Sequence, residues 1–367
     1  MEVKIDGLST ELIAHPGATL QEVLDQNNMS QRELSLRLGC TPKHTNEMIK
    51  GVKPISNTLA CQLEMVFPNI KASFWNTLQR KYDEQQEKIA QEENVTVTEI
   101  NLVRKHKEVF DYLVNESYIN TCKNDNQRVL SLRRFLKVND LSCVPELLKL
   151  PGAYRITSAN KLDEYALVSW LAVAEEECSF IDVGEWKEEN KEIIISHLNE
   201  IRSYSLLEPY EFVKKLQSFF APLGIAFVIL KTMPGVPVNG YVKQIGKRIN
   251  LCMTNRGKDS DKFWFTLFHE IGHILCCTLD SHFVDFDDKN YTNQELAADK
   301  IANLSLIDED VYSDLVGEEI TKERVINAAT KLNILPGIVV GRLQHDGYLE
   351  FNQMNELKTK YVWADDK

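Results

Sequence analysis

Apolar side chains recur every three or four residues over most of this chain, which is the period of an amphipathic helix. Glycine and proline divide the first such region, residues 12–82, into short predicted helices. Similar patterns run through residues 95–150 and 153–220, and helix is expected again from Asp261 to near the C-terminus. The pattern therefore predicts a mainly α-helical protein.

Residues 224–252 break this pattern and predict a small β-sheet. The segment 224–231 (GIAFVILK) is rich in β-branched residues, and the following 233–240 (MPGVPVNG) has the composition of turns. Residues 241–244 and 248–252 complete a strand-rich patch. The fold class expected is α+β overall, with a small sheet inside a mainly helical chain.

Two segments are expected to divide the chain into three parts. Residues 82–94 (YDEQQEKIAQEEN) carry five carboxylates against one lysine, which is typical of a solvated helix end or a connector. Leu150-Pro151-Gly152 has the composition of a turn. We therefore expect a first domain at 1–82, a helical connector at 83–150 and a second domain at 151–367.

The first domain contains the pattern of a helix-turn-helix. Ser30 is a suitable N-cap for a helix ending at Gly39, and Glu33 would complete a capping box. Thr41-Pro42 then opens a second helix that Gly51 ends. Such a pair presents its second helix to the major groove of DNA. A plain helical domain without DNA-binding function is the alternative.

The second helix carries side chains suited to DNA contact. Met48 and Ile49 are expected in the core. Lysines suit phosphates and asparagine suits an adenine edge. The outward-facing candidates are Lys43, His44, Asn46, Glu47 and Lys50.

Charge is divided unevenly along the chain. The net charge is −12, but residues 1–82 hold nine basic against eight acidic residues, so the rest of the chain holds the whole excess of acid. A nucleic-acid contact is therefore expected only from the first domain. The eight cysteines form no CxxC pair, and no secretory signal or membrane span is apparent, so we expect a cytoplasmic protein with reduced thiols.

The second domain contains a metal-binding motif. In the segment FWFTLFHEIGH, His269 and His273 are four residues apart, so on a helix both can bind one zinc ion. Glu270 would then accept the proton of the attacking water. Two buried core histidines without a metal are the alternative.

A catalytic zinc also needs a third protein ligand. The positions of a metzincin glycine and third histidine hold Cys276 and Leu279 instead. Glu295 on a following helix is the preferred candidate, and Asp299, one turn later, could orient a zinc histidine. Glu295 could instead cap its helix together with Thr292. The rival ligands are Cys277, Asp280 and His282.

Two resemblances extend this interpretation. Residues 11–82, with His15-Pro16-Gly17, the helix-turn-helix, Ile55-Ser56 and Phe74-Trp75, resemble a HigA-type antitoxin of the Xre-like repressor group. This resemblance implies a dimeric domain that binds operator DNA in its own promoter.

Residues 150–362 resemble the ImmA/IrrE family of metallo-endopeptidases. The resemblance is carried by residues 249–256, the HExxH segment, Glu295-xx-Ala298-Asp299-xx-Ala302 and the segment 328–345. It implies a zincin-like fold and a zinc-dependent endopeptidase that cuts or regulates a repressor. The chain lacks the proline that the family usually has shortly after the position of Ala302.

The pattern of residues 321–343 is also compatible with a second helix-turn-helix. The acidic run before them would repel DNA phosphates, so we expect these helices to pack within the peptidase domain instead. A peptidase also needs a donor that stabilises the oxyanion formed from the peptide carbonyl. Tyr241, Arg256 and His345 are candidates, although their spacing from the HExxH motif favours none of them.

The leading hypothesis is a DNA-binding regulator of the toxin–antitoxin or stress-response kind with a zinc peptidase domain. Its expected partners are its own promoter, a cognate toxin or repressor and a second copy of itself. In the alternative, the zinc domain only binds a toxin or senses a signal and cleaves nothing.

Overall fold

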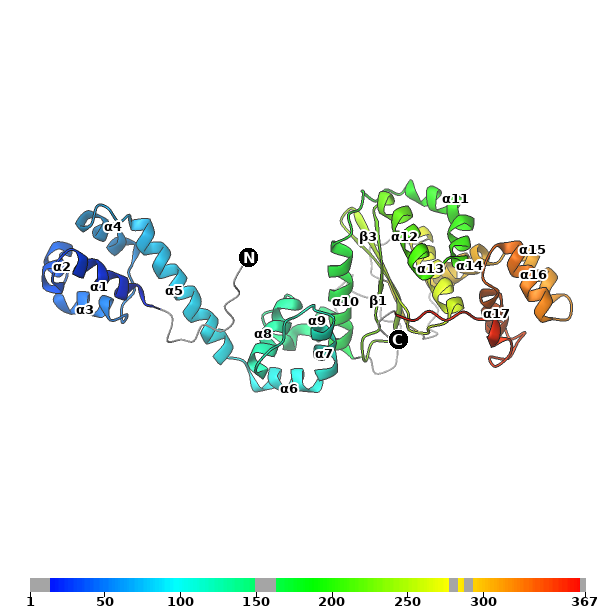
Figure 1. Cartoon of the computed structure of the whole chain (residues 1–367), viewed down its shortest axis with the longest axis horizontal. Coiled ribbons are helices and arrows are strands. Elements are labelled where there is room, and N and C mark those ends of the chain that lie inside the picture. The colour runs from blue at the N-terminus through cyan, green and yellow to red at the C-terminus, as the bar shows by residue number, and fades with distance from the viewer. Residues whose placement is uncertain (1–13, 149–162, 277–282, 287–292, 364–367) are drawn as a thin grey trace. The chain divides into compact units, whose positions relative to one another are not determined.

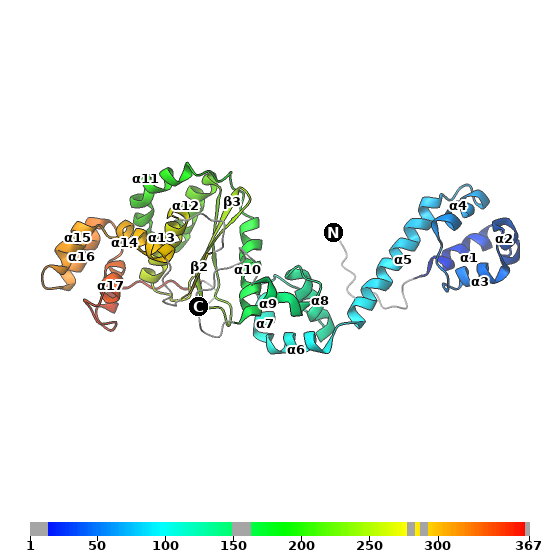
Figure 2. The same cartoon turned by 180° about the vertical axis from the view of Figure 1, so that it is seen from behind.

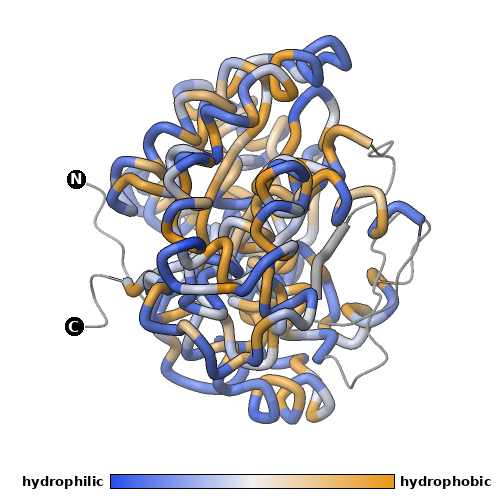
Figure 3. Tube along the Cα trace, turned by 90° about the vertical axis from the view of Figure 1, so that its right-hand side faces the viewer, coloured by the Kyte–Doolittle hydropathy of each residue, from blue (hydrophilic) through white to orange (hydrophobic). Residues whose placement is uncertain are grey.

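The computed structural model describes residues 14–148, 163–276, 283–286 and 293–363. The chain forms two compact units, 1–100 and 101–367. Hydrophobic and hydrophilic residues alternate along the chain trace in Figure 3. Within the described residues, no helix is long and apolar enough to cross a membrane.

The first unit is helical and contains the predicted helix-turn-helix. Its fully buried core side chains include Leu24, Leu34, Met48 and Trp75. Its helices are α1 (Pro16–Gln26), α2 (Gln31–Leu38), α3 (Pro42–Ile49), α4 (Asn57–Val66) and α5 (Ala72–Glu93) (Figure 1). The helix α6 (Val97–Lys105) begins in this unit and ends in the second.

The caps of α2 and α3 follow the sequence prediction with one difference. The Ser30 hydroxyl accepts a hydrogen bond from the Glu33 N–H at 3.1 Å, and Gly39 ends α2 in the left-handed conformation with φ of 66°. The Thr41 hydroxyl accepts from the His44 N–H at 3.2 Å. The reciprocal half of the capping box is not made by Glu33, because its carboxylate instead accepts from Arg37 at 2.7 Å.

The helix α5 crosses the expected boundary at residue 82. Its first half packs in the core of the unit, where the buried Gln79 side chain accepts from the Ile55 N–H at 2.9 Å. The ring of Tyr82 packs on His15 with the centroids 4.6 Å apart. The acidic residues that follow form the solvated end of the same helix, one of the two forms expected for residues 82–94.

The second unit surrounds a four-stranded mixed sheet with the strand order β1-β3-β2-β4. Strand β1 pairs with β3 in parallel, and β2 pairs with both β3 and β4 in antiparallel orientation. The strands are β1 (Ile225–Leu230), β2 (Val238–Ile245), β3 (Arg248–Thr254) and β4 (Phe283–Phe286). The fourth strand was not predicted, because its four residues are too few for a recognisable alternation.

Helices precede and follow the sheet, so the unit is mainly helical with a small sheet, as predicted. The helices before it are α7 (Lys107–Asn115), α8 (Asp125–Phe135), α9 (Val144–Leu147), α10 (Glu164–Ser179), α11 (Asn190–Ser203) and α12 (Pro209–Phe220). The helix α13 (Ser260–Cys276) lies between β3 and β4 in the chain, and the helices after β4 are α14 (Asn293–Leu306), α15 (Glu309–Val316), α16 (Lys322–Leu332) and α17 (Pro336–His345). The expected boundary at 150–152 lies outside the described residues.

The two faces of the sheet carry different helices, as Figures 1 and 2 show from opposite sides. On β3, Ile249 and Leu251 join the core that contains Trp264 and Phe268 of α13. The alternate residue Cys252 lies against α10, with its sulfur 3.3 Å from that of Cys178. Because successive strand residues point to opposite faces, the sheet separates an α13 face from an α10 face.

The segment 321–343 forms two helices that pack against the core of the second unit, as expected. Its helices α16 and α17 bury Val325, Leu332, Val339 and Leu343 in the same core as the α13 side chains.

Candidate metal centre

The helix α13 places two histidines of the predicted motif side by side. His269 and His273 are one turn apart on a buried helix, and their Nε2 atoms lie 2.9 Å from each other. Both side chains are almost completely buried, with 5% and 1% of their surface exposed. The apolar residues around the motif bury α13 on nearly all sides, so the two rings have little freedom to turn away.

Glu295, in the first turn of α14, completes the cluster. Its Oε2 atom lies 3.1 Å from Nε2 of His269 and 3.4 Å from Nε2 of His273. Close packing of the two helices makes this possible, because a side-chain carbon on Gly272 would lie 2.8 Å from the α-carbon of Ala298. A larger residue than glycine at position 272 would push α14 and its carboxylate away.

The donor atoms fit a tetrahedral metal ion. Zinc bonds to histidine nitrogen and carboxylate oxygen are about 2.0–2.2 Å long, so neighbouring ligands of a tetrahedral ion are roughly 3.3 Å apart. The three donor–donor distances here are 2.9, 3.1 and 3.4 Å. The cluster of His269, His273 and Glu295 could therefore hold a metal ion, and its two imidazoles and one carboxylate are ligands that zinc accepts.

Asp299 contacts the outer nitrogen of a cluster histidine, as predicted. Its Oδ1 atom lies 2.7 Å from Nδ1 of His269. A proton on Nδ1 donates to this carboxylate, which leaves the Nε2 lone pair facing the cluster. Asp299 is one helical turn beyond Glu295, so α14 supplies both carboxylates from one face.

The side chain of Glu270 extends from α13 toward strand β2 of the sheet. Its side chain is fully buried, and the backbone of Gly240 on β2 packs against its carboxylate so closely that a side-chain carbon there would lie 2.2 Å from Oε1. Sequence reasoning did not identify Gly240 as part of the site, because the residue stands in a run with turn composition. It belongs to β2, and its lack of a side chain makes room for the carboxylate.

The ionisation of the cluster suits metal binding. Burial raises the pKa of Glu295, but hydrogen bonds and charge from His269 and His273 outweigh it and lower the pKa to about 2. Burial lowers the pKa of His273, and the opposing effect of the Glu295 carboxylate is smaller. At neutral pH the cluster therefore offers an ionised carboxylate and a neutral His273, the forms that bind a metal.

The rival third ligands all lie outside the described residues. Thr292, the proposed cap partner of Glu295, lies outside the described residues, as do Cys277, Asp280 and His282. The Glu295 carboxylate itself faces the two histidines.

Of the three suggested oxyanion donors, Tyr241 lies away from the cluster. Tyr241 lies on the α10 face of the sheet, where the centroid of its ring is 6.0 Å from that of Trp170. This position excludes Tyr241 as an oxyanion donor at the metal cluster. An Arg256 nitrogen donates to the Pro237 carbonyl at 3.1 Å. His345 is largely exposed and its Nδ1 lies 3.0 Å from Asp346.

The candidate DNA-contacting residues lie on the solvent side of α3. Lys43 and Lys50 are exposed, and His44, Asn46 and Glu47 are half-buried. Met48 is buried as expected, Ile49 is half-buried against the same core, and Thr45 is buried in addition.

Glu47 is held by two lysines. Its carboxylate lies 3.8 Å from the Lys43 amino group and 3.0 Å from that of Lys53. Lys53 follows α3, and its Nζ atom also lies 3.4 Å from Nδ1 of His44. Sequence reasoning missed Lys53 because it stands beyond the helix that was expected to carry the contacts.

Comparison with known proteins adds two findings. Residues 239–344 match the model of the IrrE N-terminal-like domain of the M78 peptidases, a range that includes His269, His273, Glu295 and Asp299. In addition, 69 residues are 35% identical to virulence-associated protein A′ of Dichelobacter nodosus. That alignment covers 19% of this chain, and the chain spans 60% of the length of that relative.

Proposed function

We propose that the second unit is a zinc-dependent endopeptidase that cuts a specific protein partner. The observation that carries this proposal is the convergence of two histidine nitrogens and a Glu295 oxygen within 3.4 Å of one another, beside the buried Glu270. The match of residues 239–344 to a peptidase domain supports it.

Different residues of the site are proposed to bind the metal, to transfer the proton and to hold the catalytic side chains in position. Zinc, when bound by His269, His273 and Glu295, would activate a water molecule and polarise a peptide carbonyl. Glu270 accepts the proton of the attacking water and passes it to the leaving amine. Gly240 and the β2 backbone hold the Glu270 carboxylate in place, while Asp299 holds the ring of His269.

The range of protein substrates is expected to be narrow. Residues outside the first 82 carry most of the chain's negative charge, and the histidines and Glu270 are almost completely buried. Both features disfavour general degradation of unfolded protein. A repressor or a component of a toxin system is the proposed partner, and the chain's own 83–150 segment is a further candidate.

The first unit is proposed to be a dimeric DNA-binding domain that recognises its own promoter. The support is the α2–α3 pair with its observed caps, which presents Lys43, Asn46 and Lys50 on one side. In this proposal a cut in the partner, or in this chain, changes transcription of the operon. A role in a toxin–antitoxin or stress response follows from the combination of the two units.

Near-complete burial of Glu270 also favours a second candidate function, an antitoxin or repressor whose zinc domain binds a toxin or senses a signal without cutting. Co-expression of the chain with the product of the neighbouring gene separates the two. Intact masses are compared between wild type and Glu270→Gln. A shortened partner only with wild type supports the peptidase, and a stable uncut complex with both supports the binding module.

A further inference from the structure

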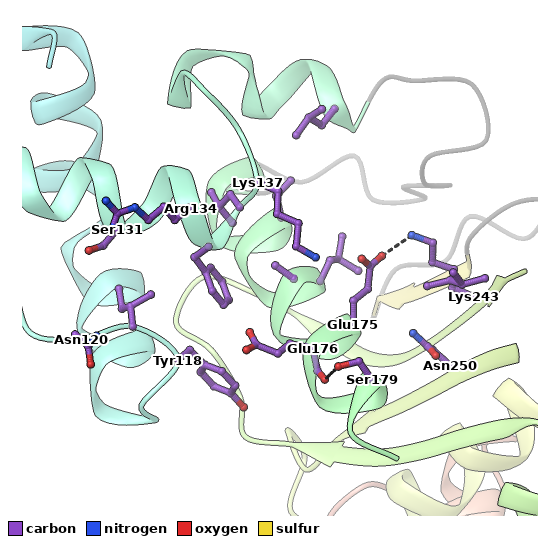
Figure 4. Close-up of a pocket in the computed structure, with 18 of the residues that line it drawn as sticks. Tyr118, Asn120, Ser131, Arg134, Lys137, Glu175, Glu176, Ser179, Lys243 and Asn250 are labelled. Carbon is purple, nitrogen blue, oxygen red and sulfur yellow. Dashed lines mark hydrogen bonds and ion pairs between the residues drawn. The ribbon is translucent and has the colours of Figure 1, made fainter. Parts of the chain in front are cut away.

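The second unit contains a large cavity that is separate from the metal cluster. Its volume is about 990 Å³, within the range of small-molecule sites. The walls come from the segment 118–147, from α10 and from β2 and β3 (Figure 4). Tyr118 helps to fix these walls relative to one another, because its hydroxyl donates to Glu177 at 2.8 Å.

The cavity lies on the α10 face of the sheet. Lys243 of β2 and Asn250 of β3 line it, whereas their neighbours Val242 and Ile249 point into the core shared with α13. The metal cluster lies on the α13 face, where Glu270 meets Gly240. Because the sheet separates them, an occupant of the cavity is not the peptide that reaches the metal.

The cavity is basic although the chain is acidic. Its lining has four basic residues, Arg134, Lys137, Lys243 and Arg248, against two acidic ones, Glu175 and Glu176. Lys243 is paired with Glu175 (Figure 4), and Arg248 donates to a backbone carbonyl of α10. Lys137 forms no ion pair with any residue that the structure describes, so its charge is available to a ligand.

Lys137 has an unusual backbone conformation for a lysine. It follows α8 with φ of 57°, the left-handed region in which glycine is favoured. Its amino group points into the cavity, toward Glu175 (Figure 4). The Lys137 side chain is exposed to solvent, so its charge lies where a ligand that enters the cavity can reach it.

Asn250 supplies a second, independent indication. Its side chain is 2% exposed and lines the cavity. Its Oδ1 atom has no hydrogen-bond partner among the described residues. Buried polar atoms of this kind are normally paired, so a hydrogen-bond donor of a ligand would satisfy it. The remaining lining includes the apolar side chains of Phe135, Leu136, Val168 and Leu171.

We propose that this cavity binds a small organic anion with an apolar body. The anionic group pairs with Lys137, a donor of the ligand reaches Asn250, and the apolar body packs against α8 and α10.

The binding test uses the full chain and a pair of matched probes. 8-Anilinonaphthalene-1-sulfonate has an aromatic body and an anionic group, and N-phenyl-1-naphthylamine has the same body without the charge. Both are titrated by fluorescence against wild type and three variants. The variants are Lys137→Gly, Ala172→Trp, which fills the cavity from α10, and the control Lys258→Gly.

Lys258 is a close match to Lys137. It is a lysine with φ of 56°, it is exposed, and it does not line the cavity. Both glycine variants remove one charge and relieve the same backbone conformation, so neither is expected to unfold the protein. Zinc content and circular dichroism confirm that the Ala172→Trp variant is folded.

We expect saturable binding of the sulfonate to wild type and to Lys258→Gly, weakened about tenfold in Lys137→Gly and lost in Ala172→Trp. The uncharged probe should bind wild type and Lys137→Gly equally. Equal affinity of the sulfonate for wild type and Lys137→Gly, or undiminished binding to folded Ala172→Trp, would overturn the proposal. Absence of saturable sulfonate binding to wild type would overturn it as well.

Discussion

The backbone of Gly240 touches the carboxylate of Glu270 so closely that a side-chain carbon at position 240 would lie 2.2 Å from its Oε1 atom. Strand β2 therefore sets the position of the proposed proton acceptor. We expect Gly240→Ala to displace Glu270 while the metal ligands on α13 and α14 stay in place. Partner cleavage should slow by roughly 10²-fold, because misplacement of a reacting group by about 1 Å has an effect of this size.

The measurement is the rate of partner cleavage by intact mass, together with zinc content. Gly257→Ala is the matched control, since the nearest atom there is the flexible Lys262 side chain at 2.6 Å. Loss of zinc from Gly240→Ala, or an unchanged rate, would show that β2 does not position Glu270.

Removal of a single cluster residue should abolish zinc binding. We expect one zinc per chain in wild type and none in His269→Ala, His273→Ala or Glu295→Ala, because each supplies one of three donor atoms. Glu323→Ala, an exposed glutamate on α16, should retain the metal. Metal analysis after dialysis checks this. A full zinc complement in Glu295→Ala would move the third ligand to Cys277, Asp280 or His282.

Asp299→Asn should weaken zinc binding without removing the site. The carboxylate lies 2.7 Å from Nδ1 of His269, and loss of such an outer partner typically costs 10- to 100-fold in metal affinity. Competition with a chromogenic chelator measures the change. Wild-type affinity in Asp299→Asn would mean that packing alone orients the ring.

The metal-free protein should lose stability as the pH falls below about 6.5. Burial lowers the pKa of His273 below its usual 6.5, so the unfolded chain takes up this proton more readily than the folded one. The free energy of unfolding then decreases as pH falls from 6.5 toward the folded-state pKa. Urea unfolding of the chelator-treated protein between pH 7.5 and 5.5 tests this. His273→Ala should show a shallower pH dependence, and an equal slope would contradict the assignment.

Much of the fold follows from local sequence signals. The caps at Ser30 and Thr41 use hydroxyls that bond within one helical turn, and Gly39 ends α2 through its left-handed backbone, so their positions in the sequence are sufficient to predict them. The spacing of His269 and His273 likewise follows from helix geometry, which places residues four apart on one face. The packing of α16 and α17 into the core of the second unit was predicted from the acidic run before them.

Other features depend on contacts between distant segments and were not predictable. Gly240 meets Glu270 only because β2 packs on α13, thirty residues away in the chain. Tyr241 was suggested as an oxyanion donor, but strand alternation turns it to the opposite face. The cavity beside Asn250 requires α8, α10 and β3 together, and no sequence motif marks it.

DNA binding by the first unit should depend on the exposed lysines of α3. In gel shifts with the full chain and its own promoter, Lys43→Ala should weaken binding to all duplexes alike and reduce the salt slope by about one unit. Asn46→Ala should instead cost about 1–3 kcal/mol at one base pair. Lys88→Ala, on the solvated end of α5, is the control. No preference for the promoter over random duplex would exclude a repressor role.

The central claim is that this zinc site cuts a protein partner with Glu270 as the proton acceptor. It is tested most directly by labelling new protein N-termini in cells that express wild type or Glu270→Gln, at rest and under stress. Both proteins should contain one zinc. We predict a small number of new N-termini in the wild-type cells that Glu270→Gln forms about 10²–10⁴-fold more slowly. Identical sets of N-termini in both cells, under both conditions, would contradict the claim.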